Sequence, residues 1–238
     1  MKKTERPRRV VSLVPSLTEC VAASAPDLLV GVTDWCTHPS GLPVPRIGGT
    51  KNPRVAEIVA LRPDVVLANA EENREPDLDA LQAAGLHVWL TDYETVPAAL
   101  EGLAAMLSML GLGRPPWLAE AENAWAEPWN GRRCAALVPI WRRPWMALGR
   151  DTFAGDVLQR LGVDNVLAGD TERYPRIESG ALPAHDVVVL PDEPYAFSAD
   201  DGPEAFDVPA RLVSGRHLTW YGPSLAEARA VLQRQLWS

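Results

Sequence analysis

Residues 134–155 read CAALVPIWRRPWMALGRDTFAG and begin as a short apolar run, which is typical of a buried strand. The run ends at Val138-Pro139, and two indole rings and two guanidinium groups follow within a few residues. Asp151-Thr152 then predicts the start of a helix. Trp and Arg side chains offer flat faces and fixed donors, so this loop is a candidate ligand surface. The alternative is a strand–loop–helix corner whose tryptophans pack inward.

Three stretches of the first half of the chain recur in the same order in the second half. The pairs are SLVPS at 12–16 with ALVPI at 136–140, LRPDVVLAN at 61–69 with LPAHDVVVLPD at 182–192, and GLHVWLTD at 85–92 with DVPARLVSG at 207–215. The apolar runs are continuous and predicted helices separate them, which indicates parallel strands covered on both faces. The repetition predicts an α/β fold of two similar lobes with a ligand cleft between them.

The segment between the two halves predicts a connecting helix. Apolar residues recur there at helical spacing, at Trp117, Leu118, Ala121 and Trp125. We therefore expect an N-terminal α/β lobe at 1–112, a bridging helix at 113–131 and a C-terminal α/β lobe at 132–238. The alternative is a surface helix of a single domain.

Composition and charge exclude several kinds of partner. The 238 residues carry a formal net charge of −8, which argues against nucleic acid, because phosphate binding needs a basic face. No stretch approaches the roughly twenty apolar residues of a membrane span, so no membrane insertion is expected. The N-terminal apolar run is interrupted by Pro15 and Ser16, and Glu19 directly precedes Cys20, which fits neither a signal peptide nor a lipoprotein signal. We expect a cytoplasmic protein, or a periplasmic or cell-surface protein if a leader has been removed.

Catalytic and metal-binding motifs are not found in the sequence. No Gly-x-Gly-x-x-Gly follows a predicted strand, and no Gly-x-Ser-x-Gly occurs. The four histidines are scattered, and the three cysteines are widely spaced and odd in number, which predicts buried thiols rather than a zinc site or a disulfide framework. We expect no catalytic residue, no metal ligand and no catalytic cofactor.

Aromatic side chains are concentrated where predicted strands end. Nine Trp stand against three Phe, and Trp is rarely buried completely, so some of these rings are expected to line a cleft. The carboxyl ends of parallel strands share one edge of a sheet, which is where ligands bind. The candidates near these ends are Pro15, Ser16, Trp35, Trp141, Arg142, Trp145, Tyr174, Tyr195 and Trp220. Ser16 also fits a helix N-cap, with Glu19 as its capping-box partner.

Several motifs in order resemble one family over nearly the whole chain. They are SLVPSLTE, GVTDWCTHP, PRIGGTKNP, EIVALRPDVVLA, LVPIWRRPWMALGRDTFAGDVLQRLGVDNVLA, ERYPRI, DVVVLPDEPYAF and HLTWYGP. Together they resemble the cobalamin-binding branch of the helical-backbone metal receptors, the class III solute-binding proteins of ABC transporters. The resemblance implies two Rossmann-like lobes bridged by a long helix, with a metal chelate held in the cleft and left chemically unchanged.

Carried over position by position, the resemblance assigns roles to individual residues. It places Pro15 and Ser16 at the cleft edge of the first lobe and Trp35 against a corrin ring. Glu57 matches an acid that docks on a transporter permease. The remaining positions that it places in the cleft or in the loop after the paired glycines are Thr50, Lys51, Trp145, Tyr174 and Trp220.

Three functional hypotheses follow. The first is a non-catalytic binding protein for a cobalamin-like metal chelate, possessing no cofactor of its own and serving an ABC-type importer. The second is a haem or iron–siderophore binding protein, in which Tyr174, Tyr195 or Cys36 is the axial ligand of haem. The third is a cytoplasmic enzyme that modifies a tetrapyrrole or a sugar nucleotide. Its candidate acids and bases are Asp151, Asp156 and Glu193.

Overall fold

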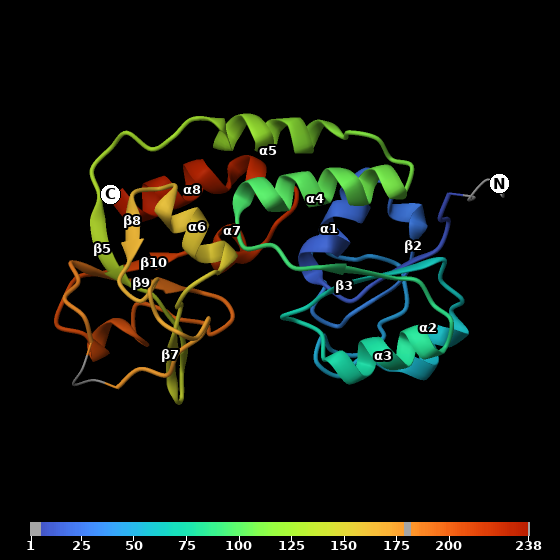
Figure 1. Cartoon of the computed structure of the whole chain (residues 1–238), viewed down its shortest axis with the longest axis horizontal. Coiled ribbons are helices and arrows are strands. Elements are labelled where there is room, and N and C mark those ends of the chain that lie inside the picture. Colours follow the sequence, from blue (N-terminus) through green and yellow to red (C-terminus); the bar gives the residue numbers. More distant parts are fainter. Residues whose placement is uncertain (1–5, 179–181, 238) are drawn as a thin grey trace. The chain divides into compact units, whose positions relative to one another are not determined.

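The computed structural model describes residues 6–178 and 182–237, which form two compact units (Figure 1). Unit 1 contains the residues through Asp92, together with Leu100–Ala119 and Tyr221–Pro223. Unit 2 contains Tyr93–Ala99, Glu120–Trp220 and the residues from Ser224 onward. The division into 1–112, 113–131 and 132–238 remains a prediction.

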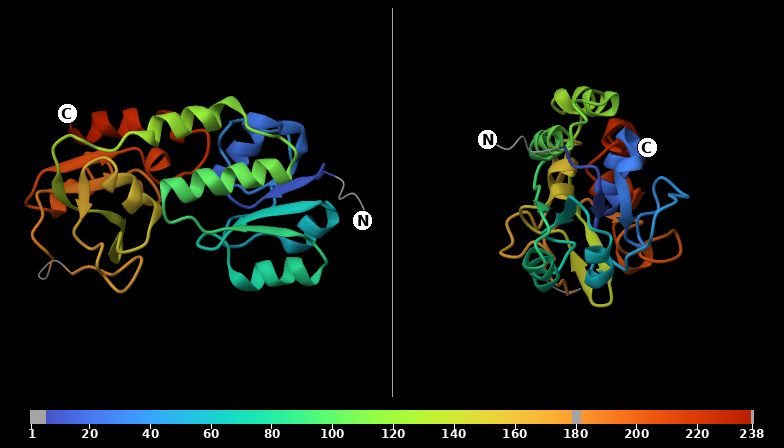
Figure 2. Two further views of the ribbon diagram at one scale, coloured as in Figure 1. Left: turned by 45° about the horizontal axis from the view of Figure 1, so that its top comes forward. Right: turned by 90° about the vertical axis from the view of Figure 1, so that its right-hand side faces the viewer.

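Unit 1 is built on a parallel four-stranded sheet. Its strands lie in the order β2 (Leu29–Val32), β1 (Val10–Ser12), β3 (Val65–Asn69) and β4 (Val88–Thr91). The two central strands, β1 and β3, are buried along their whole lengths, as continuous apolar runs predict for a sheet covered on both faces. Helices provide that cover, with α2 (Val55–Ala60) and α3 (Glu75–Ala83) on one face and α1 (Pro15–Ser24) on the other (Figures 1 and 2).

Unit 2 is built on a second parallel four-stranded sheet. Its strands lie in the order β10 (Ala210–Val213), β9 (Val187–Pro191), β5 (Cys134–Leu137) and β8 (Val163–Asn165). On one face lie α6 (Phe153–Gln159) and α8 (Leu225–Trp237), as Figure 1 shows. A core of Leu137, Ala147, Val188, Leu190 and Phe197 is covered by largely irregular segments rather than by helices. The short helix α7 (Gly215–Thr219) follows β10.

The α/β fold with two parallel sheets is confirmed, and so is the internal repetition. In unit 1, β1 lies between β2 and β3, and β4 lies beyond β3. In unit 2, β5 lies between β8 and β9, and β10 lies beyond β9. The three repeated stretches therefore fall on corresponding strands: β1 with β5, β3 with β9, and β4 with β10.

One repeated aspartate ties together the two central strands of each sheet. Asp64 stands directly before β3, and its Oδ2 accepts hydrogen bonds from the backbone N–H groups of Arg8 and Arg9, at 2.7 and 2.9 Å. Asp186 stands directly before β9, and its Oδ2 accepts from the N–H of Ala135 at 2.8 Å. The Asp-Val-Val motif shared by the two halves thus has a structural cause, because each carboxylate fixes where the neighbouring strand begins.

Two local expectations are wrong. The loop expected at Trp141–Trp145 is an antiparallel hairpin of β6 (Pro139–Arg142) and β7 (Trp145–Ala147). Ser16 is not an N-cap, because α1 begins at Pro15 and no side chain caps it. Proline suits the first turn of a helix, where its missing N–H is not needed, and this moves the helix start ahead of the serine.

Two helices lie between the two halves of the chain, and α5 falls within the range 113–131 predicted for the bridging helix. α4 runs over Val96–Met109 and α5 over Pro116–Ala126. The inward positions of α5 are confirmed, because Trp117, Leu118, Ala121 and Trp125 are all buried. The boundary between the units falls within both helices, and the bridging role of α5 remains a prediction. Within the described ranges, no helix has the length and apolar character needed to cross a membrane.

Replacing Asp64 by Ala tests the strand-fixing aspartate. The backbone N–H groups of Arg8 and Arg9 lose their carboxylate acceptor, so the free energy of unfolding is expected to fall by about 1–2 kcal/mol. Urea denaturation measures this change. The exposed Asp79→Ala in α3 is the control and should change the free energy by less than about 0.5 kcal/mol. Equal losses in both variants would contradict the assignment.

Candidate ligand-binding site

Unit 1 presents one large exposed ring close to the carboxyl end of β2. Trp35 is 66% exposed, and its indole Nε1 lies beside Gly49, where an added Cβ would stand 3.3 Å from that nitrogen. Such an exposed indole is a large apolar surface with nothing packed on most of it. Trp35 is therefore placed as a ligand-contacting residue would be.

Pro15 and Ser16 lie in the first turn of α1, close to the end of β1, and both are buried. The hydroxyl of Ser16 has no hydrogen-bond partner among the described residues, although only 3% of the residue is exposed. A buried hydroxyl usually finds a partner, so this one is available to a group that approaches it. Their role as ligand contacts remains a prediction.

The loop that carries Thr50 and Lys51 is tied to the segment after β3. Asn73 Nδ2 donates to the Thr50 carbonyl at 3.0 Å, and Lys51 Nζ donates to the carbonyl of Glu71. Asn73 Oδ1 also accepts from the N–H of Asn69 at 2.9 Å. The ammonium group of Lys51 is therefore partly satisfied by the segment after β3 rather than wholly available to a ligand.

A buried polar network at the end of β3 was not predicted. Asn69 Nδ2 donates to the Tyr221 hydroxyl at 2.8 Å and to the Thr91 carbonyl at 3.1 Å. Tyr221 belongs to the short segment Tyr221–Pro223 of unit 1, more than a hundred residues further along the chain. The sequence marks Asn69 as the end of a strand, but no local pattern identifies so distant a partner.

In unit 2, the hairpin β6–β7 carries one exposed and one packed tryptophan. Trp141 is 41% exposed and meets the Tyr195 ring edge-on, with centroids 5.6 Å apart. Trp145 stacks on Phe197 at 5.9 Å and meets Phe206 edge-on at 5.3 Å. The expectation of a ligand surface thus fits Trp141 best, and the alternative of inward packing fits Trp145 best.

Arg142 is held by carboxylates of the same unit. Its guanidinium forms ion pairs with Asp201 and Glu204, and only 19% of its side chain is exposed. Glu204 also accepts a hydrogen bond from the N–H of Gly202, and this bond, assisted by Arg142, holds the pKa of Glu204 below its usual value. Asp201 accepts in addition from the Tyr195 hydroxyl at 2.6 Å. The guanidinium is therefore committed to the protein itself.

The remaining aromatic candidates lie near the ends of β9 and β10 or in the irregular segments. Trp220 is nearly buried, and its Nε1 donates to Glu193 at 3.1 Å. Arg216 lies over the Trp220 ring, 5.7 Å from its centroid. Tyr174 is half-buried. These rings contribute less exposed surface than Trp35 or Trp141.

The predicted docking acid Glu57 lies in α2 and remains largely exposed. Its carboxylate pairs with Arg54 at 2.7 Å, one turn earlier. An exposed pair of this kind contributes little to stability, about 0–1 kcal/mol, so its carboxylate can exchange partners at low cost.

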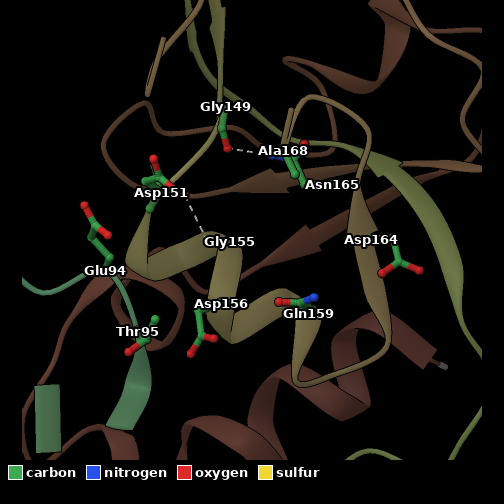
Figure 3. A pocket seen from close by; sticks show the side chains of 11 residues that line it. Glu94, Thr95, Gly149, Asp151, Gly155, Asp156, Gln159, Asp164, Asn165 and Ala168 are labelled. Carbon is green, nitrogen blue, oxygen red and sulfur yellow. Dashed lines mark hydrogen bonds between the residues drawn. The ribbon is translucent and has the colours of Figure 1, made fainter. Parts of the chain in front are cut away.

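A polar cavity of about 290 Å³ lies in unit 2 (Figure 3). Its acidic lining residues each have an arginine partner: Glu94 with Arg173, Asp151 with Arg150, Asp156 with Arg160, and Asp164 with Arg133. Asp156 also accepts from the N–H of Val96, at the start of α4, at 2.7 Å. The cavity contains none of the predicted ligand residues. Across the described ranges, no group of three or more His, Cys, Asp or Glu side chains is placed to hold a metal ion.

A second cavity of about 280 Å³ has Trp145 and Phe206 in its lining. Trp145 is one of the predicted ligand residues. The planes of Trp145 and Phe206 meet at 70°, so the edge of one ring meets the face of the other.

The candidate acids of the enzyme hypothesis are engaged in structural contacts. Asp151 pairs with Arg150 at 3.5 Å, and Asp156 with Arg160 at 2.7 Å. Glu193 accepts from the indole of Trp220. None of these arrangements is a nucleophile–base pair or a pair of carboxylates facing one reacting bond.

The axial-ligand candidates differ in availability. Cys36 is buried, its thiol lies 3.0 Å from the Thr18 hydroxyl and 3.1 Å from that of Thr33, and burial raises its pKa. A thiol in this state is a poor metal ligand, since the thiolate is the binding form. Tyr195 donates to Asp201, which leaves its phenol oxygen with acceptor capacity only.

Sequence comparisons identify relatives of one kind, although no protein-family model matches the chain. The vitamin B12-binding protein of Yersinia pestis (strain Pestoides F) is 33% identical over 181 residues, which are 71% of this chain and 63% of that protein. The vitamin B12-binding protein of Pectobacterium carotovorum subsp. carotovorum (strain PC1) is 23% identical over 188 residues, 72% of this chain and 66% of that protein. The chain thus spans slightly less than two thirds of the length of these curated relatives.

Solved structures share the fold. The periplasmic vitamin B12-binding protein BtuF of Vibrio cholerae has a TM-score of 0.74 at 17% identity, over 97% of this chain and 96% of that one. The periplasmic haem-binding protein RhuT from Roseiflexus sp. RS-1 has a TM-score of 0.77 at 20% identity, over 96% and 97%. Both are described as periplasmic, so these neighbours do not support the expected cytoplasmic location.

Replacing each tryptophan of the hairpin tests which of the two rings is packed and which is exposed. Trp145→Ala removes a ring that stacks on Phe197, and the free energy of unfolding should fall by about 2–4 kcal/mol. Trp141→Ala removes an exposed ring and should lower it by about 1 kcal/mol or less. Urea denaturation measures both. A larger loss for Trp141→Ala would reverse the assignment.

The lowered pKa of Glu204 predicts a pH dependence. A carboxylate with a lowered pKa stabilises the fold above its ordinary pKa and loses this effect as the pH falls through the lowered value. The stability difference between the wild type and Glu204→Gln should hold from pH 7 to about pH 5 and shrink below that. Denaturation series at several pH values measure it, and a difference that persists to about pH 2 would contradict the prediction.

Proposed function

Because the chain belongs to the class III solute-binding proteins of ABC transporters, we propose that it binds a cobalamin-like metal chelate and leaves it unchanged. The main support for this proposal is the 33% identity with a vitamin B12-binding protein over 71% of this chain. The candidate acids of the enzyme hypothesis are engaged in structural contacts, Asp151 with Arg150, Asp156 with Arg160 and Glu193 with Trp220.

Exposed indoles support a flat, partly apolar ligand. Trp35 in unit 1 and Trp141 in unit 2 are both large exposed rings close to the carboxyl end of a strand in their own sheet. Stacking on an indole removes apolar area from water on both partners, and the quadrupole of the ring adds to this. The half-buried Tyr174 and Tyr195 and the nearly buried Trp220 would shape the surroundings of such a ligand. Ser16, Thr50 and Lys51 would supply polar contacts, and Pro15 would supply an apolar one.

Haem is the second candidate ligand. Structural neighbours named haem-binding proteins share the fold, and haem requires an axial ligand. Tyr174 suits this role better than the buried Cys36. A Soret shift on adding haem that disappears in Tyr174→Phe, together with absent cobalamin binding, would favour haem.

The proposed partner is an ABC-type permease, which the protein would meet on the side of the membrane that faces away from the cytoplasm. Glu57 would dock on it by exchanging its exposed ion pair with Arg54 for an arginine of the permease. The exposed carboxylate and its position on a surface helix support this role.

Calorimetric titration with cyanocobalamin tests the proposed function. The wild type should bind one equivalent with a Kd of about 1 μM or tighter, which corresponds to about −8 kcal/mol. Trp35→Ala and Trp141→Ala should each weaken binding about tenfold, because each loses a stacking surface worth about 1 kcal/mol or more.

Trp129→Phe is the matched control. This indole stacks on Trp237 near the amino end of β5 and lies outside the proposed site. Its variant should bind as the wild type does. Unchanged affinity in both Trp35→Ala and Trp141→Ala would refute the site, and absent binding by the wild type would refute the ligand.

A further inference from the structure

Unit 2 departs from the internal repetition at one place. In unit 1, α1 begins at Pro15, immediately beyond the end of β1 at Ser12. In unit 2, β5 ends at Leu137 but α6 begins only at Phe153, and the hairpin β6–β7 occupies the chain between them. The hairpin is thus an addition at the carboxyl edge of the second sheet, and it carries the exposed Trp141.

The two strands of the hairpin are held differently. Backbone hydrogen bonds fix β7 to the segment 175–177, from the Ala147 N–H to the Pro175 carbonyl at 3.0 Å and from the Ile177 N–H to the Trp145 carbonyl at 3.1 Å. The end of β6 is held by a side chain, through the ion pairs of Arg142 with Asp201 and Glu204. A two-stranded hairpin is marginal by itself, so these attachments decide where its residues stand.

From this arrangement we propose that Arg142 is a positioning residue, which fixes Trp141 for ligand contact and does not bind the ligand itself. Arg142 fixes Asp201, Asp201 accepts from the Tyr195 hydroxyl at 2.6 Å, and the Tyr195 ring meets Trp141 edge-on at 5.6 Å. The contacts return to the residue next to Arg142, so they form a closed ring around the end of β6. The proposal rests on the proposed function, because ligand contact by Trp141 is part of that function.

The charges explain why an arginine is needed at this position. Two carboxylates converge on one guanidinium, whose planar fork presents separate N–H groups to each of them. Without Arg142, Asp201 and Glu204 would repel each other, and the end of β6 would lose both of its ion pairs with this segment. The guanidinium also lies 5.4 Å from the centroid of the Trp145 ring, which adds a cation–π contact.

Two measurements test the proposal, one made without the ligand and one made with it. Chymotrypsin under native conditions cleaves after Trp141 only when the hairpin opens locally, so Arg142→Gln should raise this cleavage rate about tenfold. The same variant should weaken cyanocobalamin binding about tenfold. Arg142→Lys keeps the charge but not the planar guanidinium, so its affinity and cleavage rate should lie between those of the wild type and Arg142→Gln. Arg133→Gln breaks another arginine–carboxylate pair of unit 2, with Asp164, and should change neither readout.

Removing the carboxylates distinguishes positioning from direct contact. If Arg142 bound the ligand, the double variant Asp201→Asn, Glu204→Gln would free the guanidinium and strengthen binding. If it positions Trp141, the same double variant weakens binding and speeds cleavage after Trp141. Stronger binding, or a wild-type cleavage rate in Arg142→Gln, would overturn the proposal.

The experiments distinguish a wrong ligand assignment from a wrong role for Arg142. A wild type that binds no cyanocobalamin refutes the proposed ligand, while the cleavage rates still decide whether Arg142 fixes the hairpin. Faster cleavage in Arg142→Gln with unchanged cleavage in Arg133→Gln would then support the positioning role by itself.

Discussion

The need to cover both faces of two parallel sheets governs the rest of this structure. The central strands β1, β3 and β9 are buried along their whole lengths, so helices or packed irregular segments must lie on either side of them. Polar and exposed groups are then left to the strand ends. Asp64 and Asp186 fix the amino ends, and the aromatic rings gather near the carboxyl ends. Trp35 follows β2 directly, whereas Trp141 is carried by the hairpin added at the carboxyl edge of the second sheet.

Most of the fold was predictable because its signals are local and occur twice. Continuous apolar runs such as 65–69 and 187–191 mark buried strands wherever they occur, and Thr152 caps α6 as expected, accepting from the N–H of Gly155 at 3.2 Å. The hairpin was not predicted, because the Arg-Arg-Pro between two tryptophans lacks the alternation of a strand. The helix start was misplaced because Pro15 competes with Ser16 for the first turn.

The candidate site was only partly predictable for a different reason. The sequence shows which residues are aromatic, but exposure depends on partners far away in the chain. Trp141 and Trp145 are four residues apart, yet Phe197 and Phe206 cover one while the other stays exposed. The role of Arg142 as a ligand contact remains a prediction, but the sequence does not indicate its ion pairs with Asp201 and Glu204, about sixty residues further on. No local pattern records such pairings.

Equilibrium dialysis distinguishes a protein that binds a metal chelate and returns it unchanged from one that alters it. The purified chain is dialysed against cyanocobalamin, the bound ligand is counted by its absorption, and the ligand released on unfolding is analysed by mass spectrometry. We expect one bound ligand per chain and recovery of the intact molecule. No retained ligand, or a chemically altered one, would contradict it.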